Sequence, residues 1–133
     1  MMLLSEAAKA LKAEHIGADV AFDSVGADSR HIKQDQLFVA LKGQNFDGHN
    51  YASQAIAQGA AAVLVEKVTE ATPALLVQDT LQALGALSHY WRNKFAIPIL
   101  AVTGSNGKTT VKEMLAAILR ASTETSDQVL ATE

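Results

Sequence analysis

The sequence contains no cysteine among its 133 residues. This absence excludes a disulfide framework and a thiolate nucleophile. The N-terminus also lacks a basic stretch followed by an apolar stretch of signal-peptide length. The longest apolar run, residues 95–102, is far too short to span a bilayer. We therefore expect a cytoplasmic protein.

A concentrated positive charge is lacking as well. The net charge is −3, and the 11 Lys and Arg residues are scattered along the chain. Nucleic-acid binding needs a basic face, so the sequence gives no reason to expect it. Apolar residues make up 49% and charged residues 19%, which is typical of a folded soluble protein. The length suffices for one core, or for one small domain and part of another.

The first part of the chain alternates between helix and strand patterns. Ser5 and the apolar residues around it predict a short capped helix that ends near Gly17. Residues 23–30 are polar and irregular. A helix is expected over residues 50–58, closed by Gly59, because glycine accepts the left-handed conformation at a helix end. Short apolar runs predict strands over residues 36–41, 61–65 and 74–77.

A second helix pattern begins at Asp79, with Gln82 three residues later as in a capping box. Its apolar stripe is expected to be buried and consists of Leu84, Leu87, Trp91 and Phe95. Residues 97–102 are almost continuously apolar, as strands buried on both faces of a parallel sheet are. A further helix should follow the next loop, with an apolar stripe of Val111, Met114, Leu115, Ile118 and Leu119.

This alternation predicts an α/β fold. We expect a small N-terminal α/β domain over residues 1–78. Residues 79–133 would then begin a parallel-sheet domain with its first strand, loop and helix. One helix, one strand and one helix cannot close a core, even with a further strand over residues 128–130. The second domain is therefore expected to be incomplete, and the sequence to be part of a longer protein.

Residues 103–110 read TGSNGKTT and have the features of a phosphate-binding loop. Backbone N–H groups in a glycine-rich turn can converge on phosphate oxygens, and the following helix adds its positive end. Lys108 supplies a charge for the β- and γ-phosphates, while Thr109 supplies a hydroxyl for Mg²⁺, with Thr110 as a neighbouring candidate. The predicted ATP-binding residues are Gly104, Ser105, Asn106, Gly107, Lys108, Thr109 and Thr110.

The strict phosphate-loop pattern has a glycine where this chain has Val102, so the match is to the variant TGxxGKTT. The simpler alternative is a strand-to-helix turn that contains two glycines and a capping threonine. That alternative does not explain a lysine followed by two threonines directly after a buried strand. We therefore interpret the loop as a nucleotide site.

At this loop the sequence resembles the Mur ligase family, whose members share the TGxxGKTT form. The resemblance extends over nearly the whole chain. The other resembling segments are Asp28–Arg30 (DSR), Gln36–Gly43 (QLFVALKG), Phe46–His49 (FDGH) and Gly59–Val65 (GAAAVLV).

The resemblance implies a three-domain, ATP- and Mg-dependent ligase of peptidoglycan precursor synthesis. Its domains would bind a uridine-nucleotide substrate, ATP and an incoming amino acid or dipeptide. Ser29 and Arg30 match positions that contact the UDP part of the substrate, and Lys42 and Gly43 are further substrate-binding candidates. Lys108 would be catalytic. We expect a monomer, and we do not expect the 133-residue chain alone to catalyse ligation.

Two members of the family share most of this pattern. One adds the third amino acid of the stem peptide, and the other adds D-alanyl-D-alanine to UDP-N-acetylmuramoyl-tripeptide. The segments at residues 111–114 (VKEM) and 129–133 (VLATE) look more like the dipeptide-adding member. A non-catalytic nucleotide-binding regulatory module is the alternative from another class, but it has no need of a UDP-substrate domain.

Several residues also have simpler interpretations. From the residues alone, Arg30 is explained slightly better as a solvated loop arginine. His49 is read as a structural or substrate-rim residue, because the four histidines show no metal-ligand spacing. Trp91 and Met114 are assigned to the core by their helical spacing. Lys112 and Glu113 are expected to form an exposed ion pair.

Overall fold

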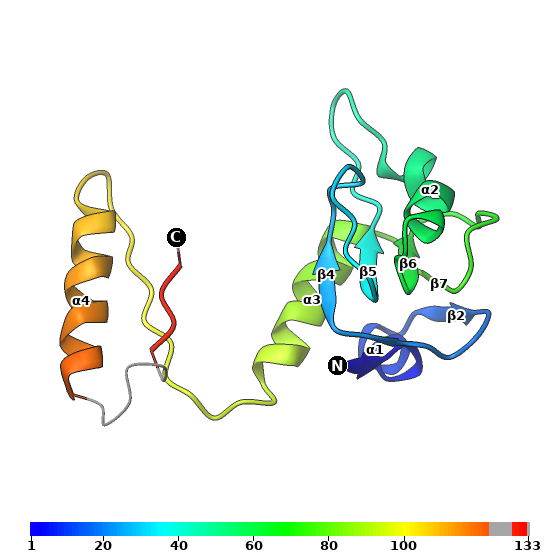
Figure 1. Cartoon of the computed structure of the whole chain (residues 1–133). Coiled ribbons are helices and arrows are strands. Elements are labelled where there is room, and N and C mark those ends of the chain that lie inside the picture. Colours follow the sequence, from blue (N-terminus) through cyan, green and yellow to red (C-terminus); the bar gives the residue numbers. More distant parts are fainter. Residues whose placement is uncertain (123–128, 133) are drawn as a thin grey trace. The chain divides into compact units, whose positions relative to one another are not determined.

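The computed structural model describes residues 1–122 and 129–132. The chain forms two compact units, Met1–Phe95 and Ala96–Glu133 (Figure 1). The strands are β1 (Met2–Leu3), β2 (Glu14–Ile16), β3 (Ala21–Phe22), β4 (Ser24–Gly26), β5 (Gln36–Val39), β6 (Ala62–Val65) and β7 (Ala74–Leu76). The helices are α1 (Leu4–Leu11), the 3₁₀ helix η1 (Gly48–Tyr51), α2 (Ala52–Ala57), α3 (Thr80–Arg92) and α4 (Lys108–Ser122).

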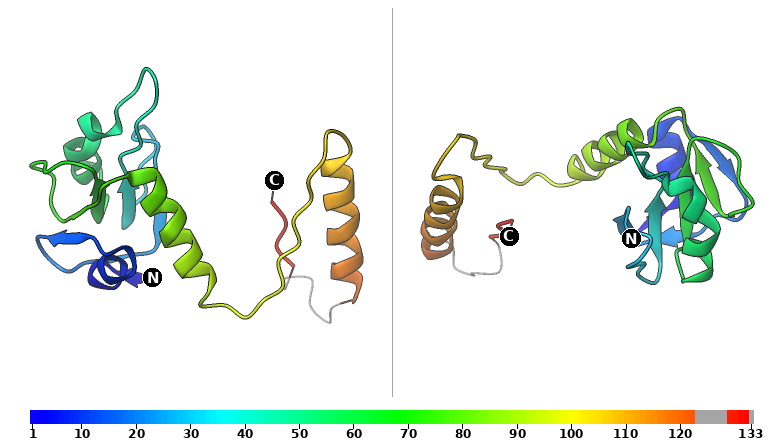
Figure 2. Two further views of the ribbon diagram at one scale, coloured as in Figure 1. Left: turned by 180° about the vertical axis from the view of Figure 1, so that it is seen from behind. Right: turned by 90° about the horizontal axis from the view of Figure 1, so that it is seen from above.

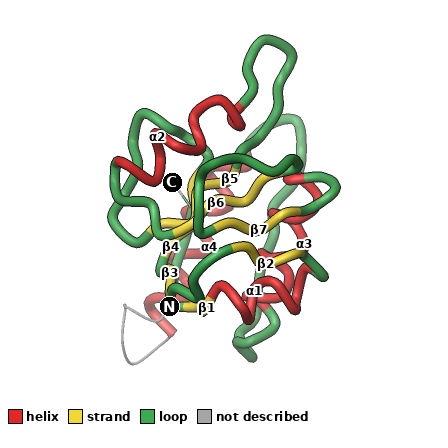
Figure 3. The backbone as a smooth tube through the Cα atoms, turned by 90° about the vertical axis from the view of Figure 1, so that its right-hand side faces the viewer, coloured by secondary structure: helices red, strands yellow, loops and turns green. Residues whose placement is uncertain are grey.

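A five-stranded sheet with the order β2-β7-β6-β5-β4 forms the centre of the first unit (Figure 3). β4, β5, β6 and β7 are parallel, and β2 joins the edge antiparallel to β7. Every residue of β5 and β6 is buried. This burial fits apolar strands in the middle of a parallel sheet and confirms the predicted α/β class.

Helices cover both faces of this sheet (Figure 2). Leu37 and Val39 of β5 pack in one apolar cluster with residues of α1 and α3. Phe38 points to the opposite face and packs with residues of α2. Because successive side chains of a strand alternate between faces, one short strand contributes to both cores.

The N-terminal segment differs from the prediction. The helix α1 ends at Leu11, where Lys12 adopts the left-handed conformation with a φ of 53°, so it does not reach Gly17. Ser5 does not cap it through its own side chain. Instead, the Asp19 carboxylate accepts hydrogen bonds from the Ser5 backbone N–H and hydroxyl. The strands β1 to β4, each of two or three residues, were not predicted.

The boundary between the units lies later than the predicted one between residues 78 and 79. The helix α3 belongs to the first unit, because it packs against α1. The Tyr90 hydroxyl donates to Glu6 of α1 over 2.8 Å, and Lys94 forms an ion pair with the same carboxylate. The predicted start of α3 is confirmed, since the Asp79 side chain accepts from the Gln82 backbone N–H over 2.8 Å.

The predicted apolar stripe of α3 is buried only in part. Leu87 is buried, with 3% of its surface exposed. Trp91 and Phe95 are 36% and 46% exposed and contact each other edge to face. The assignment of Trp91 to the core was therefore wrong, because the helix runs beyond the part of the first unit that covers it.

The second unit differs more strongly from the expectation. Residues 97–102 form no strand, and Ile97, Ile99 and Leu100 are more than half exposed. A buried strand needs a neighbouring strand, and no strand is found among the residues described in this unit. Met114 is 59% exposed, so its assignment to the core was also wrong. Gln128 of the predicted strand lies outside the described residues, and Val129 and Leu130 form no strand.

Among the described residues, no helix combines the length and the hydropathy needed to cross a membrane.

Candidate functional site

A group of polar residues, Asp28, Ser29 and Arg30, follows the carboxyl end of the parallel strand β4. In open α/β sheets, ligands bind in crevices at this edge. A cleft of about 650 Å³ lies there, lined by Ala27, Asp28, Ser29, Arg30, Phe46 and Tyr51. One wall is the segment that follows β4, and the other comes from the connection between β5 and α2. Two of the predicted substrate residues, Ser29 and Arg30, therefore lie on this cleft.

Arg30 is held in place by Asp28. The guanidinium Nε and Nη2 atoms donate to the two oxygens of the Asp28 carboxylate, each over 2.9 Å, and the Arg30 backbone N–H donates over 3.0 Å. These hydrogen bonds lower the pKa of Asp28 well below its ordinary value and raise the pKa of Arg30. The Arg30 side chain is still 81% exposed. A fixed, exposed guanidinium is suited to bind a phosphate group.

The other substrate candidates lie beside the cleft and do not line it. Lys42 is exposed and forms an isolated bridge with Asp47. The Gly43 N–H donates to the Phe46 carbonyl oxygen over 2.7 Å and so closes the turn before the second wall. Ser29, in contrast, does line the cleft, although the residue is largely buried, with 6% of its surface exposed.

Phe46 and Tyr51 are cleft residues that the sequence analysis did not identify. Their ring centroids are 5.4 Å apart and the ring planes differ by 12°, so the rings are stacked. Both remain partly exposed, Phe46 by 44% and Tyr51 by 37%. The sequence did contain a sign of these cleft residues. Phe46 lies in a predicted loop and Tyr51 at the start of a predicted helix, and neither belongs to an apolar stripe. An exposed aromatic surface of this kind can stack on a base.

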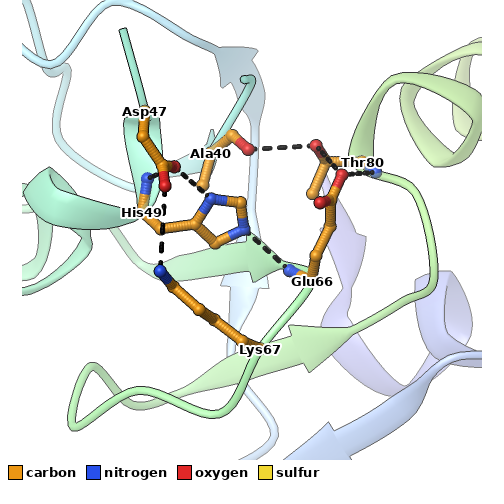
Figure 4. A network of polar contacts seen from close by, with 6 residues as sticks. All are labelled: Ala40, Asp47, His49, Glu66, Lys67 and Thr80. Atoms are coloured by element: carbon orange, nitrogen blue, oxygen red, sulfur yellow. Dashed lines mark hydrogen bonds and ion pairs between the residues drawn. The ribbon is translucent and has the colours of Figure 1, made fainter. Parts of the chain in front are cut away.

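A partly buried polar network holds this second wall (Figure 4). His49 Nδ1 lies 2.6 Å from Asp47 Oδ1, and His49 Nε2 accepts a hydrogen bond from the Glu66 N–H over 2.9 Å. The Glu66 carboxylate accepts from the Thr80 backbone N–H over 2.9 Å. The Thr80 hydroxyl oxygen lies 3.1 Å from a Glu66 carboxylate oxygen and 3.0 Å from the Ala40 carbonyl oxygen. Because the hydroxyl has a single proton, it donates to one of these acceptors at a time.

The partners of His49 define its chemical state. Nε2 accepts from a backbone N–H, so it carries no proton, and Nδ1 must then be the donor to Asp47. With both ring nitrogens bonded inside the chain, His49 has neither a lone pair nor a proton available for a substrate. These contacts favour the structural interpretation of this residue.

The phosphate loop lies in the second unit, and α4 begins at Lys108. Gly107 has a φ of 74° and Gly104 a φ of 149°, conformations that other residues rarely adopt. Residues 103–110 are exposed. The Lys108 ammonium folds back over the loop and donates to the Gly104 carbonyl oxygen. The expected pair of Lys112 and Glu113 is present one turn further on, with an N–O distance of 2.8 Å.

This loop fits a nucleotide phosphate with a bound Mg²⁺. The first N–H groups of a helix have no partner inside it, and here they belong to an exposed turn. Apart from its two chain neighbours, no described residue has an atom within 4 Å of a Cβ built on Gly107, so an anion can approach the backbone there. Lys108 and Thr109 offer a positive charge and a hydroxyl in the first turn. Neither group is buried against the protein.

Comparison with known proteins agrees with these features. The model of the Mur ligase family catalytic domain matches residues 21–123. The chain belongs to the Mur ligase family. A relative from Escherichia coli (strain K12), named UDP-N-acetylmuramoyl-tripeptide–D-alanyl-D-alanine ligase, is 46% identical over 117 residues. That alignment covers 87% of this chain and 26% of the relative.

Solved structures of Mur ligases have the same fold. A D-alanyl-D-alanyl ligase from Acinetobacter baumannii superposes with a TM-score of 0.77 at 37% identity, covering 86% of this chain and 27% of that one. A MurF ligase from Thermotoga maritima in complex with ADP superposes with a TM-score of 0.67 at 33% identity. That match covers 74% of this chain and 23% of the ligase. The chain thus spans about a quarter of the length of these Mur ligases.

Proposed function

We propose that this chain supplies the substrate-binding unit and the phosphate loop of an ATP-dependent ligase. The ligase joins D-alanyl-D-alanine to UDP-N-acetylmuramoyl-tripeptide. The 46% identity to a ligase of that name carries the proposal. The sequence of residues 111–114 also favours the dipeptide-adding member over the one that adds the third amino acid.

The proposed reaction has two steps. The γ-phosphoryl group of ATP passes to the carboxylate of the tripeptide, which gives an acyl phosphate and ADP. The amine of D-alanyl-D-alanine then attacks the acyl carbon, and inorganic phosphate leaves as the peptide bond forms. In such a phosphoryl transfer the protein mainly positions the groups and offsets the charge on the phosphate oxygens.

The phosphate loop would serve the first step. Its exposed backbone N–H groups bind the phosphates, and Lys108 leaves the Gly104 carbonyl oxygen to pair with the β- and γ-phosphates. Thr109 would hold Mg²⁺, with Thr110 beside it, and the bound ion would neutralise charge on the phosphate oxygens. A MurF ligase similar to this chain was solved in complex with ADP, which supports a nucleotide as the ligand of such a ligase.

The cleft of the first unit would hold the uridine diphosphate part of the substrate. Arg30, fixed by Asp28, is placed to bind the diphosphate, and the stacked pair of Phe46 and Tyr51 offers a flat surface to the base. Ser29, Lys42 and Gly43 lie at the same edge of the sheet. A regulatory module that only senses ATP would have no use for this cleft, which disfavours that alternative.

Titration of the 133-residue chain with uridine diphosphate tests the substrate part of this proposal. We expect saturable binding that shifts the backbone amide resonances of Ser29 and Arg30. Binding that leaves these resonances unchanged, or no binding at all, would contradict the assignment of the cleft.

A further inference from the structure

The second wall of the cleft depends on one short 3₁₀ helix. Phe46 lies directly before the capping residue of η1, and Tyr51 is its last residue. The stacked rings therefore move with η1. Any group that fixes η1 to the sheet also fixes the aromatic surface of the cleft.

His49 is such a group, because it lies in the middle of η1 and is buried, with 2% of its side chain exposed. Its Nε2 atom accepts from the N–H of Glu66, directly after β6. Its Nδ1 proton goes to Asp47, whose carboxylate also accepts from the His49 backbone N–H over 3.0 Å. One ring therefore connects the cap of η1 to the end of a central strand (Figure 4).

The surrounding groups fit this role. The Glu66 side chain itself accepts from the Thr80 backbone N–H over 2.9 Å, so the strand end that His49 meets is fixed from the other side. Lys67 lies 3.7 Å from the second oxygen of Asp47. Replacing the ring with an apolar one would deprive the N–H of the half-buried Glu66 of its acceptor, and a donor left without a partner away from water costs free energy.

We propose that His49 is a positioning residue for the substrate cleft, which holds the Phe46 and Tyr51 rings in place through its two ring hydrogen bonds. It touches no substrate and does no proton transfer. The proposal rests on the proposed function for its claim about substrate binding. Its claim about the two rings stands on the contacts of the free protein.

The test compares three variants of the 133-residue chain. His49→Phe keeps a ring of similar size but loses both ring hydrogen bonds. His49→Gln places an amide oxygen near the position of Nε2, where it can accept from the Glu66 N–H. His15→Phe is the matched control, because His15 lies in the edge strand β2 and its Nε2 atom lies 3.2 Å from the carbonyl oxygen of the nearby Ala18.

The first measurement is the proton chemical shifts of the Phe46 and Tyr51 rings without ligand. Stacked rings shift each other's resonances, so His49→Phe should move these signals towards values for unstacked rings. His49→Gln should recover part of the difference, and His15→Phe should leave the signals unchanged. Unchanged ring signals in His49→Phe would overturn the inference, whether or not the chain binds uridine diphosphate.

The second measurement is the dissociation constant for uridine diphosphate. We expect His49→Phe to weaken binding about tenfold, with partial recovery in His49→Gln and no change in His15→Phe. Wild-type affinity in His49→Phe would overturn the link between His49 and the substrate. Absence of binding by the wild-type chain would instead contradict the proposed function of the cleft.

Discussion

Gly48 lies so close to Leu41 that a Cβ atom on Gly48 would be 2.8 Å from the Leu41 carbonyl oxygen and 2.9 Å from its backbone nitrogen. The Gly48 N–H donates to the same carbonyl oxygen over 2.9 Å. Because both neighbours are backbone atoms, they cannot move aside as a flexible side chain would. The first turn of η1 can approach the end of β5 only with glycine at this position.

We predict that Gly48→Ala destabilises the first unit by about 1–3 kcal/mol, as overpacking of a close contact does. Urea denaturation of the chain measures this change. Gly85→Ala is the matched control, because Gly85 lies inside α3 and, beyond the neighbouring backbone of that helix, no described atom lies within 4 Å of an added Cβ. That variant should be stabilised by about 1 kcal/mol, the usual helix preference of alanine over glycine. Equal stability of the two variants would contradict the close contact.

The pairing of Asp28 and Arg30 leads to a prediction about ligand binding. Arg30→Lys keeps the positive charge but loses the planar group that binds Asp28 through two donors. We expect it to weaken uridine diphosphate binding about tenfold, almost as much as Arg30→Ala, as measured by calorimetric titration. Full retention of affinity in Arg30→Lys would show that charge alone is sufficient.

The same pair predicts a pH dependence of stability. Hydrogen bonds from Arg30 lower the pKa of Asp28 from its ordinary value of 3.8. A carboxyl group whose pKa is lower in the folded state stabilises the fold above its unfolded pKa. This contribution is lost as the pH falls from about that value towards the folded pKa.

Thermal unfolding of the wild type and of Asp28→Asn measures this contribution. The wild type should unfold at the higher temperature at neutral pH. The difference should shrink steadily once the pH drops below 3.8, the ordinary pKa of the group. A difference that stays constant over this range would rule out the carboxylate as its source.

Lys108 allows a prediction about the phosphate loop. In the whole ligase, Lys108→Ala should lower the rate of ATP-dependent phosphate release by about 10²–10³, the usual effect of removing one charge-stabilising donor. Lys112→Ala is the control, because Lys112 lies one turn further along α4 and pairs with Glu113. Equal losses in the two variants would point to a general effect on the helix.

The sequence was sufficient where the signals are local. Asp79 and Gln82 correctly marked the start of α3, and Gly59, with a φ of 108°, follows the end of α2 as predicted. The contiguous DSR segment also drew attention to Ser29 and Arg30, which line the cleft, while their role in substrate binding stays a prediction. In each case the deciding residues are close neighbours in the chain.

Other features depend on partners that are distant in the sequence. The strand β2 exists because it pairs with β7, which lies some sixty positions later. Residues 97–102 are apolar enough for a strand, but apolar character does not supply the neighbouring strand that such a segment needs. The contact of His49 with Glu66 joins η1 to the residue after β6, 17 positions later in the chain, so no local pattern could have shown it.

The central claim is that this chain belongs to a ligase that uses D-alanyl-D-alanine. The most direct test is phosphate release by the whole protein in the presence of ATP, Mg²⁺ and UDP-N-acetylmuramoyl-tripeptide. We predict that release requires D-alanyl-D-alanine and falls to background in Lys108→Ala. Release that occurs only with a diamino acid and the UDP-linked dipeptide would contradict this account and assign the chain to the third-residue ligase.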